Sequence, residues 1–434
     1  MTVLDAGWSE ARLRGLQDKN NCFLQEWRHK QLKKFLLMGF PDRKIENWKY
    51  TDVTQIASQT FSFDRIADDI GFNIEDFIIE GTHRMVFING YFVPALSTLT
   101  KLIPKVQLAS LKAILKEKRG KIRITDNLSS QTAFSLLNGS LFRDGMFLYV
   151  PKNFQLEEPI HLLYLMKPNF PLSMTQTRHL IFLDENANAS FIEEYRGVSS
   201  TMTYFNNIVT QIKVGDSANL VLYKLQEENS FSFHIANTQI NQAQNSQVTA
   251  CHFLLGGALG REDLHCALKG HGASCRLLGL YHPQNTQHID SHTCVDHRVS
   301  ECESQQLYKG IIGDDSKAVF NGKIFVHKGA SKTIARQTNK NLIFSDKAEV
   351  NVKPEIEIYN DDVVCTHGAT IGHLNDDTLF YLCSRGIDRI AAKHLLTCAF
   401  SSEIVEKLPH RIITEHLYAR FTKKLGVMLS GALS

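Results

Sequence analysis

The stretch DSANLVLYK (216–224) opens on a small turn pair and continues as alternating residues, as a short strand does. Loose copies recur along the chain, and several intervals between them lie between roughly 18 and 30 residues. Repeats of this length are typical of the coils of a β-solenoid. Because the spacing is irregular, a two-sheet sandwich of short strands is the alternative. The other copies are NANASFIEE (186–194), NSQVTACHF (245–253), GASCRLLGL (272–280), DSKAVFNGK (315–323), GASKTIARQ (329–337), KAEVNVKPE (347–355) and GATIGHLND (368–376).

The pattern of apolar and turn residues divides the chain into three parts. Short apolar runs between turn residues fill 141–386 and predict a β core there. Residues 1–140 predict a mixed α+β domain. It has a helical segment at 9–38, a helix at about 108–119 and, in MVFINGYFV (85–93), a strand, an Asn-Gly turn and a second strand.

The last part, 387–434, returns to a helical period and predicts two or three C-terminal helices. We expect these helices to pack on the end of the solenoid as a cap, or to receive a partner. One apolar stripe consists of Ile387, Ile390, Ala391, His394, Leu395, Cys398 and Ala399, and a second of Ile413, Leu417, Phe421 and Leu425.

Composition excludes several classes of protein. Hydrophobic residues make up 43% of the 434, which excludes global disorder. Lys and Arg number 48 against 45 Asp and Glu, so the net charge of +3 argues against a nucleic-acid partner. No signal peptide and no stretch of membrane-spanning length is found, so we expect a cytoplasmic protein without membrane contact. The nine cysteines are expected to be reduced.

The common catalytic signatures are missing from the sequence. There is no G-x-x-x-x-G-K-[ST], so we expect this chain to bind no nucleotide. Nothing places a nucleophile beside a base, and we expect no enzymatic activity. The acidic pairs Glu193–Glu194 and Glu227–Glu228 are expected to be solvated. A β-helix polysaccharide lyase or hydrolase, which uses carboxylates on a solenoid face, remains an alternative.

Residues 251–302 are unusually rich in possible metal ligands. They hold five of the nine Cys and seven of the 18 His. Thiolate and imidazole together suit iron, zinc or copper, although this spacing matches no metal-binding module. We favour ordinary strand and turn residues, with transient metal handling as the alternative. The residues are Cys251, Cys266, Cys275, Cys294, Cys302, His252, His265, His271, His282, His288, His292 and His297.

A second candidate is the stretch DDVVCTHG (361–368). Cys365 and His367 are two residues apart, so on a strand both side chains point to the same side. Sulfur and imidazole nitrogen on one face make half a site for iron or an iron–sulfur cluster, which usually takes about four protein ligands. The other ligands would come from the Cys/His-rich segment or from another protein. Packing of an ordinary strand is the alternative.

Three stretches resemble the SufB/SufD family of iron–sulfur cluster assembly proteins. They are KIENWKYT (44–51), which taken alone predicts only local packing, HTCVDHRVSECESQQLYKGI (292–311), and the long run 318–387 from AVFNGKIF to CSRGI. The WKYT signature, and the lack of the Cys-x-x-Cys that many SufB chains carry, favour the SufD branch. A SufB-like cluster scaffold is the alternative.

The resemblance implies a right-handed parallel β-helix with flanking N- and C-terminal regions. It implies a non-catalytic scaffold subunit that pairs with SufB through its last strands. The ABC-type ATPase SufC would dock on the C-terminal helices, near Ile390, Ala391, Leu395 and Phe400. A transient iron–sulfur cluster would be shared with SufB, with His367 as the favoured metal ligand and Cys365 beside it. Whether the chain forms a homodimer without SufB is left open.

Overall fold

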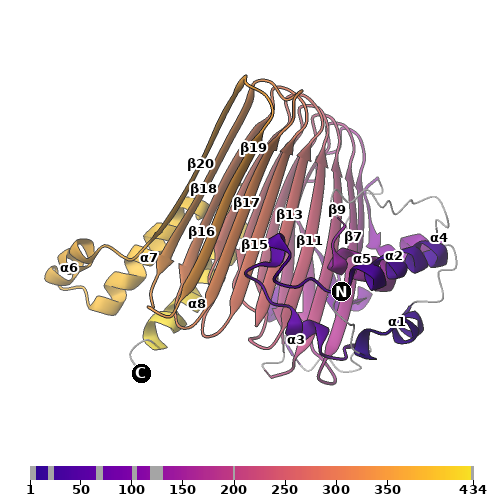
Figure 1. Ribbon diagram of the computed structural model, residues 1–434, viewed down its shortest axis with the longest axis horizontal. Coiled ribbons are helices and arrows are strands. Elements are labelled where there is room, and N and C mark those ends of the chain that lie inside the picture. The colour runs from indigo at the N-terminus through magenta and orange to yellow at the C-terminus, as the bar shows by residue number, and fades with distance from the viewer. Residues whose placement is uncertain are drawn as a thin grey trace.

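Two ten-stranded sheets form the centre of the molecule, and the chain passes from one to the other with almost every strand (Figure 1). The computed structural model describes residues 6–17, 24–64, 72–99, 105–117, 131–198 and 201–431. The first sheet, sheet A, consists of β4 (Gln107–Ser110), β5 (Met146–Val150), β7 (Ser173–Leu183), β9 (Tyr204–Val214), β11 (Phe233–Gln242), β13 (Leu259–Leu268), β15 (His288–His297), β17 (Lys317–Val326) and β19 (Glu349–Ile358), with β1 (Ser62–Phe63) beside β7.

The second sheet, sheet B, contains the strands in between. Neighbouring strands in each sheet are parallel, apart from the pairs β2–β3 and β4–β5. The expected parallel β-solenoid is therefore confirmed, and the sandwich alternative is wrong. The strands of sheet B are β3 (Tyr91–Phe92), β2 (His83–Ile88), β6 (Ile160–Met166), β8 (Asn188–Gly197), β10 (Asn219–Glu227), β12 (Gln247–Leu254), β14 (Ser274–Tyr281), β16 (Glu303–Ile312), β18 (Thr333–Ile343) and β20 (Val363–Gly372).

The turn pair of the sequence repeat marks one edge of the coils. Asn186, Ser217, Asn245 and Gly272 all have positive φ, between 54° and 69°, and each lies in the turn that leads from sheet A into sheet B. Asparagine and glycine tolerate this left-handed conformation better than other residues do. The turns stack because the strands that follow them are in register.

The irregular spacing of the repeat has a structural reason. The copies at 315–323 and 347–355 lie at the opposite edge, where the chain returns from sheet B to sheet A, and the copy at 368–376 begins inside β20. Two sets of turns are therefore interleaved in one sequence pattern. Within either set, the distance from one coil to the next is 26 to 32 residues, as in the pairs Phe233–Leu259 and Lys317–Glu349.

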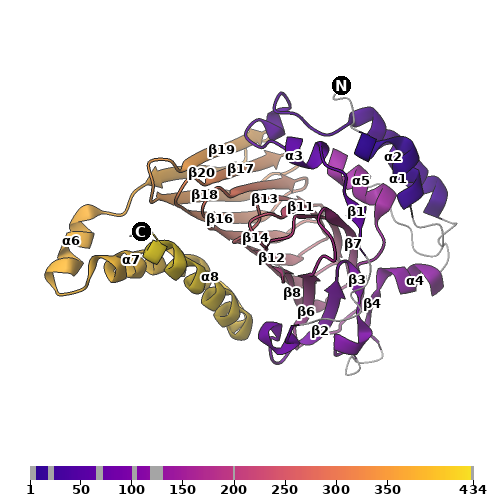
Figure 2. The same cartoon turned by 90° about the horizontal axis from the view of Figure 1, so that it is seen from below.

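In the first coils both faces of each sheet are covered, which is typical of parallel sheets. The side chains that point between the sheets fill the lumen of the solenoid, and many of them form an apolar column with residues of both sheets. The outer face of sheet A packs against the N-terminal helices, and that of sheet B against the C-terminal helices (Figure 2). No described helix has the length and apolarity that crossing a bilayer requires.

The N-terminal part differs in two places from the sequence prediction. The segment 9–38 forms two helices, α1 (Glu10–Leu16) and α2 (Gln25–Met38), and residues 18–23 lie outside the described parts. Residues 108–110 of the expected helix 108–119 belong to β4, because they pair with β5. The helix α4 spans Leu111–Glu117, and residues 118 and 119 lie outside the described parts. The strand–turn–strand of 85–93 is confirmed by β2 and β3. Two further helices here are α3 (Thr54–Ala57) and α5 (Ala133–Leu141).

The C-terminal part consists of α6 (Asp376–Ser384), α7 (Arg389–Val405) and α8 (Arg411–Gly431). The four-residue period is confirmed in α8, where Ile413, Leu417, Phe421 and Leu425 are fully buried against sheet B. The expectation of a cap is wrong. The helices α7 and α8 lie along the outer face of sheet B and α6 projects beside it, so the end of the solenoid stays open (Figure 2).

The acidic pairs correct another expectation. Glu193, Glu194 and Glu228 are buried rather than solvated. Successive residues of a strand point to opposite sides, and here both sides are covered. Glu193 points into the lumen, 3.5 Å from the Lys224 ammonium, and Glu194 points outward, 3.0 Å from His161. Buried carboxylates of this kind need paired partners, and each has one.

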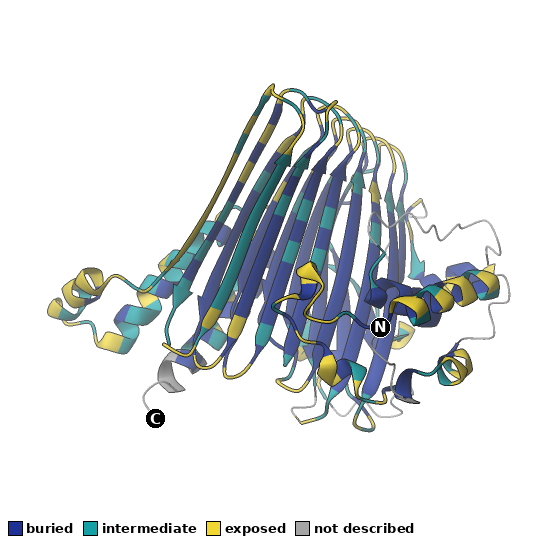
Figure 3. Cartoon of the chain, viewed as in Figure 1, coloured by how far each residue is buried: buried dark blue, intermediate teal, exposed yellow. Residues whose placement is uncertain are grey.

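The two ends of the solenoid differ. At the N-terminal end the sheets finish on short antiparallel strands, β3 in sheet B and β4 in sheet A. At the other end they finish on β19 and β20, each ten residues long, which are much less buried than the strands before them (Figure 3). The proposed domain boundaries at 140 and 386 stay predictions, and β2 to β4 already belong to the sheets.

Candidate functional site

Cys365 and His367 lie on β20, the last strand of sheet B. In register they follow Ala335 and Gln337 of β18, both of which are buried in the lumen. Cys365 and His367 therefore belong to the same lumen-facing row. In the described part of the chain no strand pairs with the outer edge of β20, so this row is uncovered: His367 is exposed and Cys365 is half-buried. The two residues stand at the open end of the solenoid.

The surroundings of Cys365 keep its thiol protonated. Its side chain packs on a small apolar cluster that includes Ile324 and Val326 of sheet A. Burial raises the pKa of this thiol, and a backbone hydrogen bond from Ala335 only partly offsets the effect. A metal ion would therefore have to displace the thiol proton to use sulfur as a ligand.

An unusual polar group stands beside His367. The Gln337 side chain is buried next to it in register, and its Nε2 donates to the carbonyl of Gly322 at 3.1 Å. Within the described residues, Gln337 Oε1 has no hydrogen-bond partner. An N–H of the neighbouring imidazole is the kind of donor this oxygen lacks, and such a bond would leave the other ring nitrogen for a metal ion.

The residues of 251–302 do not form one cluster, because alternation along the strands sends them to different places. Cys251 lies under the C-terminal helices, whereas Cys266 and Cys275 lie in the lumen. His265 and Cys294 face outward from sheet A, beside the N-terminal segment. Among the described residues, no three His, Cys, Asp or Glu side chains are arranged around one point that could hold a metal ion.

The four residues of the C-terminal helices expected to bind a partner do not lie on one surface. Ile390, Ala391 and Leu395 line an open groove beside α8, and Leu395 is 49% exposed. Phe400 instead faces the solenoid, where the Lys309 ammonium lies 4.4 Å from the centre of its ring. The apolar face that remains open is therefore the first half of α7.

The WKYT segment packs on the outer face of sheet A. Trp48 is 6% exposed, and the Arg261 guanidinium lies 3.7 Å from the centre of its ring. The Thr51 hydroxyl donates to the Asp290 carboxylate of β15 at 2.5 Å. The expected packing role of this segment is confirmed, and the segment forms one wall of a cleft over sheet A.

Two family models match the chain, and together they span most of it. The SufBD core domain of the SUF system for FeS cluster assembly matches residues 165–400, and the SufBD protein N-terminal region matches residues 10–162.

Proteins from several bacteria are similar over nearly the whole length. The iron–sulfur cluster assembly protein SufD of Escherichia coli is 32% identical over 95% of this chain and 98% of its own. A SufBD family protein of Synechocystis is 33% identical over 86% of this chain and 84% of its own. SufD of Bacillus subtilis is 24% identical over 90% and 91%.

Proposed function

The chain belongs to the SufBD family of the SUF system for iron–sulfur cluster assembly, and from this premise we propose that it is a non-catalytic scaffold subunit of the SufD type. In this role it pairs with SufB end to end and docks the ATPase SufC on its C-terminal helices. The nascent cluster is cargo, held between the two scaffold subunits in the cytoplasm. The observation that carries the proposal is the open end of the solenoid.

Pairing with SufB is supported by the two strands at this end, whose outer edges pair with no other strand among the described residues. The outer edges of β19 and β20 offer backbone N–H and C=O groups to a partner strand, as exposed edges do. The lumen-facing row of β20 also ends uncovered, with Ile371 50% exposed. A second solenoid that stacked here would continue both sheets and cover this row.

A ligand role for His367 follows from the same geometry. At a junction between two solenoids, His367 and Cys365 would face the lumen residues of the partner's terminal coil. The partner would then supply the remaining ligands that this half-site lacks. Iron would bind the imidazole nitrogen that is not directed at Gln337.

Docking of SufC is supported by the open apolar face of α7. The C-terminal half of this helix is tied to sheet B, because Glu403 pairs with Lys309 at 2.6 Å and with Lys340 at 3.2 Å. Lys340 lies on β18, the strand next to β20. A movement of α7 driven by ATP hydrolysis in SufC would therefore reach the strand beside His367.

The pairing surface is tested with Ile371→Asp. The side chain is exposed in the isolated chain, so we expect the fold to be kept. In the pair the carboxylate would be buried without a partner, and we expect SufB to be lost from a pull-down on the tagged, co-expressed chain. The matched control is Ile412→Asp, 56% exposed at the start of α8. Equal recovery of SufB with both variants would contradict pairing at this end.

The cluster site is tested with His367→Ala. We expect the variant to form the complex with SufB and SufC but to lose iron and acid-labile sulfide from the anaerobically purified complex, because the imidazole ligand is missing. His373→Ala, on the same side of the molecule just after β20, is the control and should retain both. Normal cluster content in His367→Ala would exclude the ligand role while leaving the scaffold proposal intact.

A further inference from the structure

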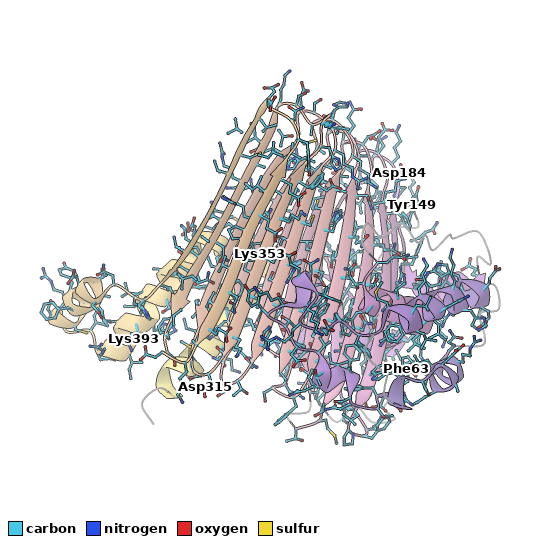
Figure 4. All side chains as sticks on the ribbon, in the orientation of Figure 1. Phe63, Tyr149, Asp184, Asp315, Lys353 and Lys393 are labelled. Atoms are coloured by element: carbon cyan, nitrogen blue, oxygen red, sulfur yellow. The ribbon has the colours of Figure 1, made fainter. Side chains whose placement is uncertain are left out.

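The outer face of sheet A carries a second set of potential ligands, away from the lumen-facing row of β20. A cleft of about 680 Å³ lies between residues 45–47 and the strands β13, β15, β17 and β19. One wall is held by the ion pair of Glu46 with Lys353, which is labelled on β19 in Figure 4. The cleft is open to solvent, so a small ion or molecule can enter.

The register of the strands brings several donors together on the floor of this cleft. His265 of β13 lies directly beside Cys294 of β15. Asp296 follows Cys294 by two residues on the same strand, so its side chain is on the same face. Neighbouring strands are about 4.8 Å apart, which places the His265 imidazole beside the Cys294 thiol, and Asp296 lies about 6.6 Å further along β15.

Asp296 stands between two imidazoles. Its Oδ1 lies 2.7 Å from His327 Nε2, and its Oδ2 lies 3.9 Å from His265 Nε2. Arg298 Nε donates to Oδ2 at 2.7 Å and fixes the carboxylate. The Asp296 side chain is 8% exposed and that of His265 17%, whereas the side chain of His327, at 42%, lies at the rim, where its ring packs 4.5 Å from that of Phe325.

Charged side chains of both signs line the cleft. The carboxylates are those of Glu46, Asp263, Asp296, Glu355 and Glu357, and the cationic groups are those of Arg298, Lys323 and Lys353. The five carboxylates outnumber the three cationic groups, which favours a cation over an anion in the cleft.

We propose that this cleft binds one divalent transition-metal ion through His265, Asp296 and His327, with Cys294 as a fourth ligand. Two imidazoles and one carboxylate are a ligand set that suits Fe²⁺, and an added thiol favours Fe²⁺, Co²⁺ or Zn²⁺ over Mg²⁺ and Ca²⁺. As the side chains are placed, the donors do not yet surround one point. His327 has to turn from its hydrogen bond with Asp296 toward the ion, and Arg298 stays on the carboxylate as its outer-shell partner.

The site belongs to this chain alone and does not depend on the proposed pairing with SufB. It lies on sheet A and points outward, whereas His367 is on sheet B and faces the lumen. It gives part of the Cys/His-rich segment a chemical role that the scaffold function does not use. If the scaffold function also holds, this is a place for iron outside the junction of the two subunits.

The test is a titration of the isolated full-length chain, without a polyhistidine tag, with Co²⁺ under anaerobic conditions. We expect one equivalent to bind, with visible d–d absorption and a thiolate-to-cobalt charge-transfer band. His265→Ala and His327→Ala should each weaken Co²⁺ binding by at least about tenfold, since even outer-shell partners are worth roughly 10- to 100-fold. Cys294→Ser should remove the charge-transfer band.

Two controls separate this site from others. His271→Ala removes an exposed imidazole in a turn of the same segment, and His373→Ala removes an exposed imidazole just after β20. Both should bind Co²⁺ as the unaltered chain does. Circular dichroism of each variant checks that the fold is kept, and His327, at the rim, is the position least tied to it. Failure of the unaltered chain to bind Co²⁺, or equal affinity in the His265 and His327 variants, would overturn the proposal.

Discussion

Lys224 carries its charge in the lumen of the solenoid, where the side chain is completely buried. Its ammonium lies 2.7 Å from Glu262 of sheet A and 3.5 Å from Glu193 of the preceding coil. Burial opposes the charge on Lys224, but the two carboxylates more than offset it and raise the pKa of the ammonium. The three charges therefore tie the two sheets together across the lumen.

Replacement of Lys224 should strongly destabilise the folded chain. We expect Lys224→Met to reduce the free energy of unfolding by about 3–5 kcal/mol, because two buried carboxylates lose their counter-charge. Urea unfolding followed by circular dichroism measures the change. Lys152→Ala removes an exposed ion pair with Glu185 and should lower the free energy of unfolding far less. Similar losses in the two variants would show that the buried charges contribute little.

The buried charges also show where sequence reasoning stops at this scale. Two adjacent glutamates look solvated, because a carboxylate usually is. The partners of Glu193 and Glu194 are Lys224 and His161, about one coil away in the chain, and no local pattern joins them. The C-x-H of β20, by contrast, was readable because both residues share one strand and its alternation. Asp296 and His327 were not, since they become neighbours only through the coil.

At the scale of elements, the helices show which patterns transfer from sequence to structure. In α8 the apolar stripe and the buried face coincide, because the stripe packs on the outer face of sheet B. In α7 they do not. Its buried residues are Ala392, Thr397, Ser401 and Ile404, while the apolar stripe stays partly open. An apolar stripe thus identifies the helix but not the surface it covers.

The packing of α8 on sheet B can be tested at the centre of the helix. Phe421→Ala should cost about 3–5 kcal/mol of unfolding free energy, because a fully buried phenyl ring is removed from the contact with sheet B. In this variant, amide hydrogen exchange should also become faster relative to the unaltered chain, and more so in α8 than in β10 or β12. Arg411→Ala, in an exposed ion pair at the start of the same helix, is the control. Unchanged protection of α8 in Phe421→Ala would show that other contacts hold this helix.

The whole molecule carries a pH dependence that comes from its buried histidines. Burial lowers the pKa of His252 to about 3 and of His179, His282 and His297 to about 4. In the unfolded chain the value is about 6.5. Below pH 6.5 the unfolded chain therefore binds more protons than the folded one, and stability falls as the pH falls from about 6.5 to 4.

One of these histidines is a clean test case. Both ring nitrogens of His252 are buried without a hydrogen-bond partner in the described residues. We expect His252→Leu to lower the slope of unfolding free energy against pH by up to about 1.4 kcal/mol per pH unit between pH 6 and 4. Urea unfolding at several pH values measures it. His29→Gln, exposed on α2, is the matched control, and an unaltered slope in His252→Leu would refute the assignment.

The unequal ends of the solenoid determine how many partners the molecule can bind along its axis. A stack of coils with two open ends could add units without limit and would polymerise into a fibre. Here one end is terminated by β3 and β4, which are only two and four residues long and leave little edge to pair with. The other end carries the two long strands. Under the proposed pairing the chain would therefore be monovalent along its axis, so end-to-end association would stop at a pair and the junction would occur once in each assembly.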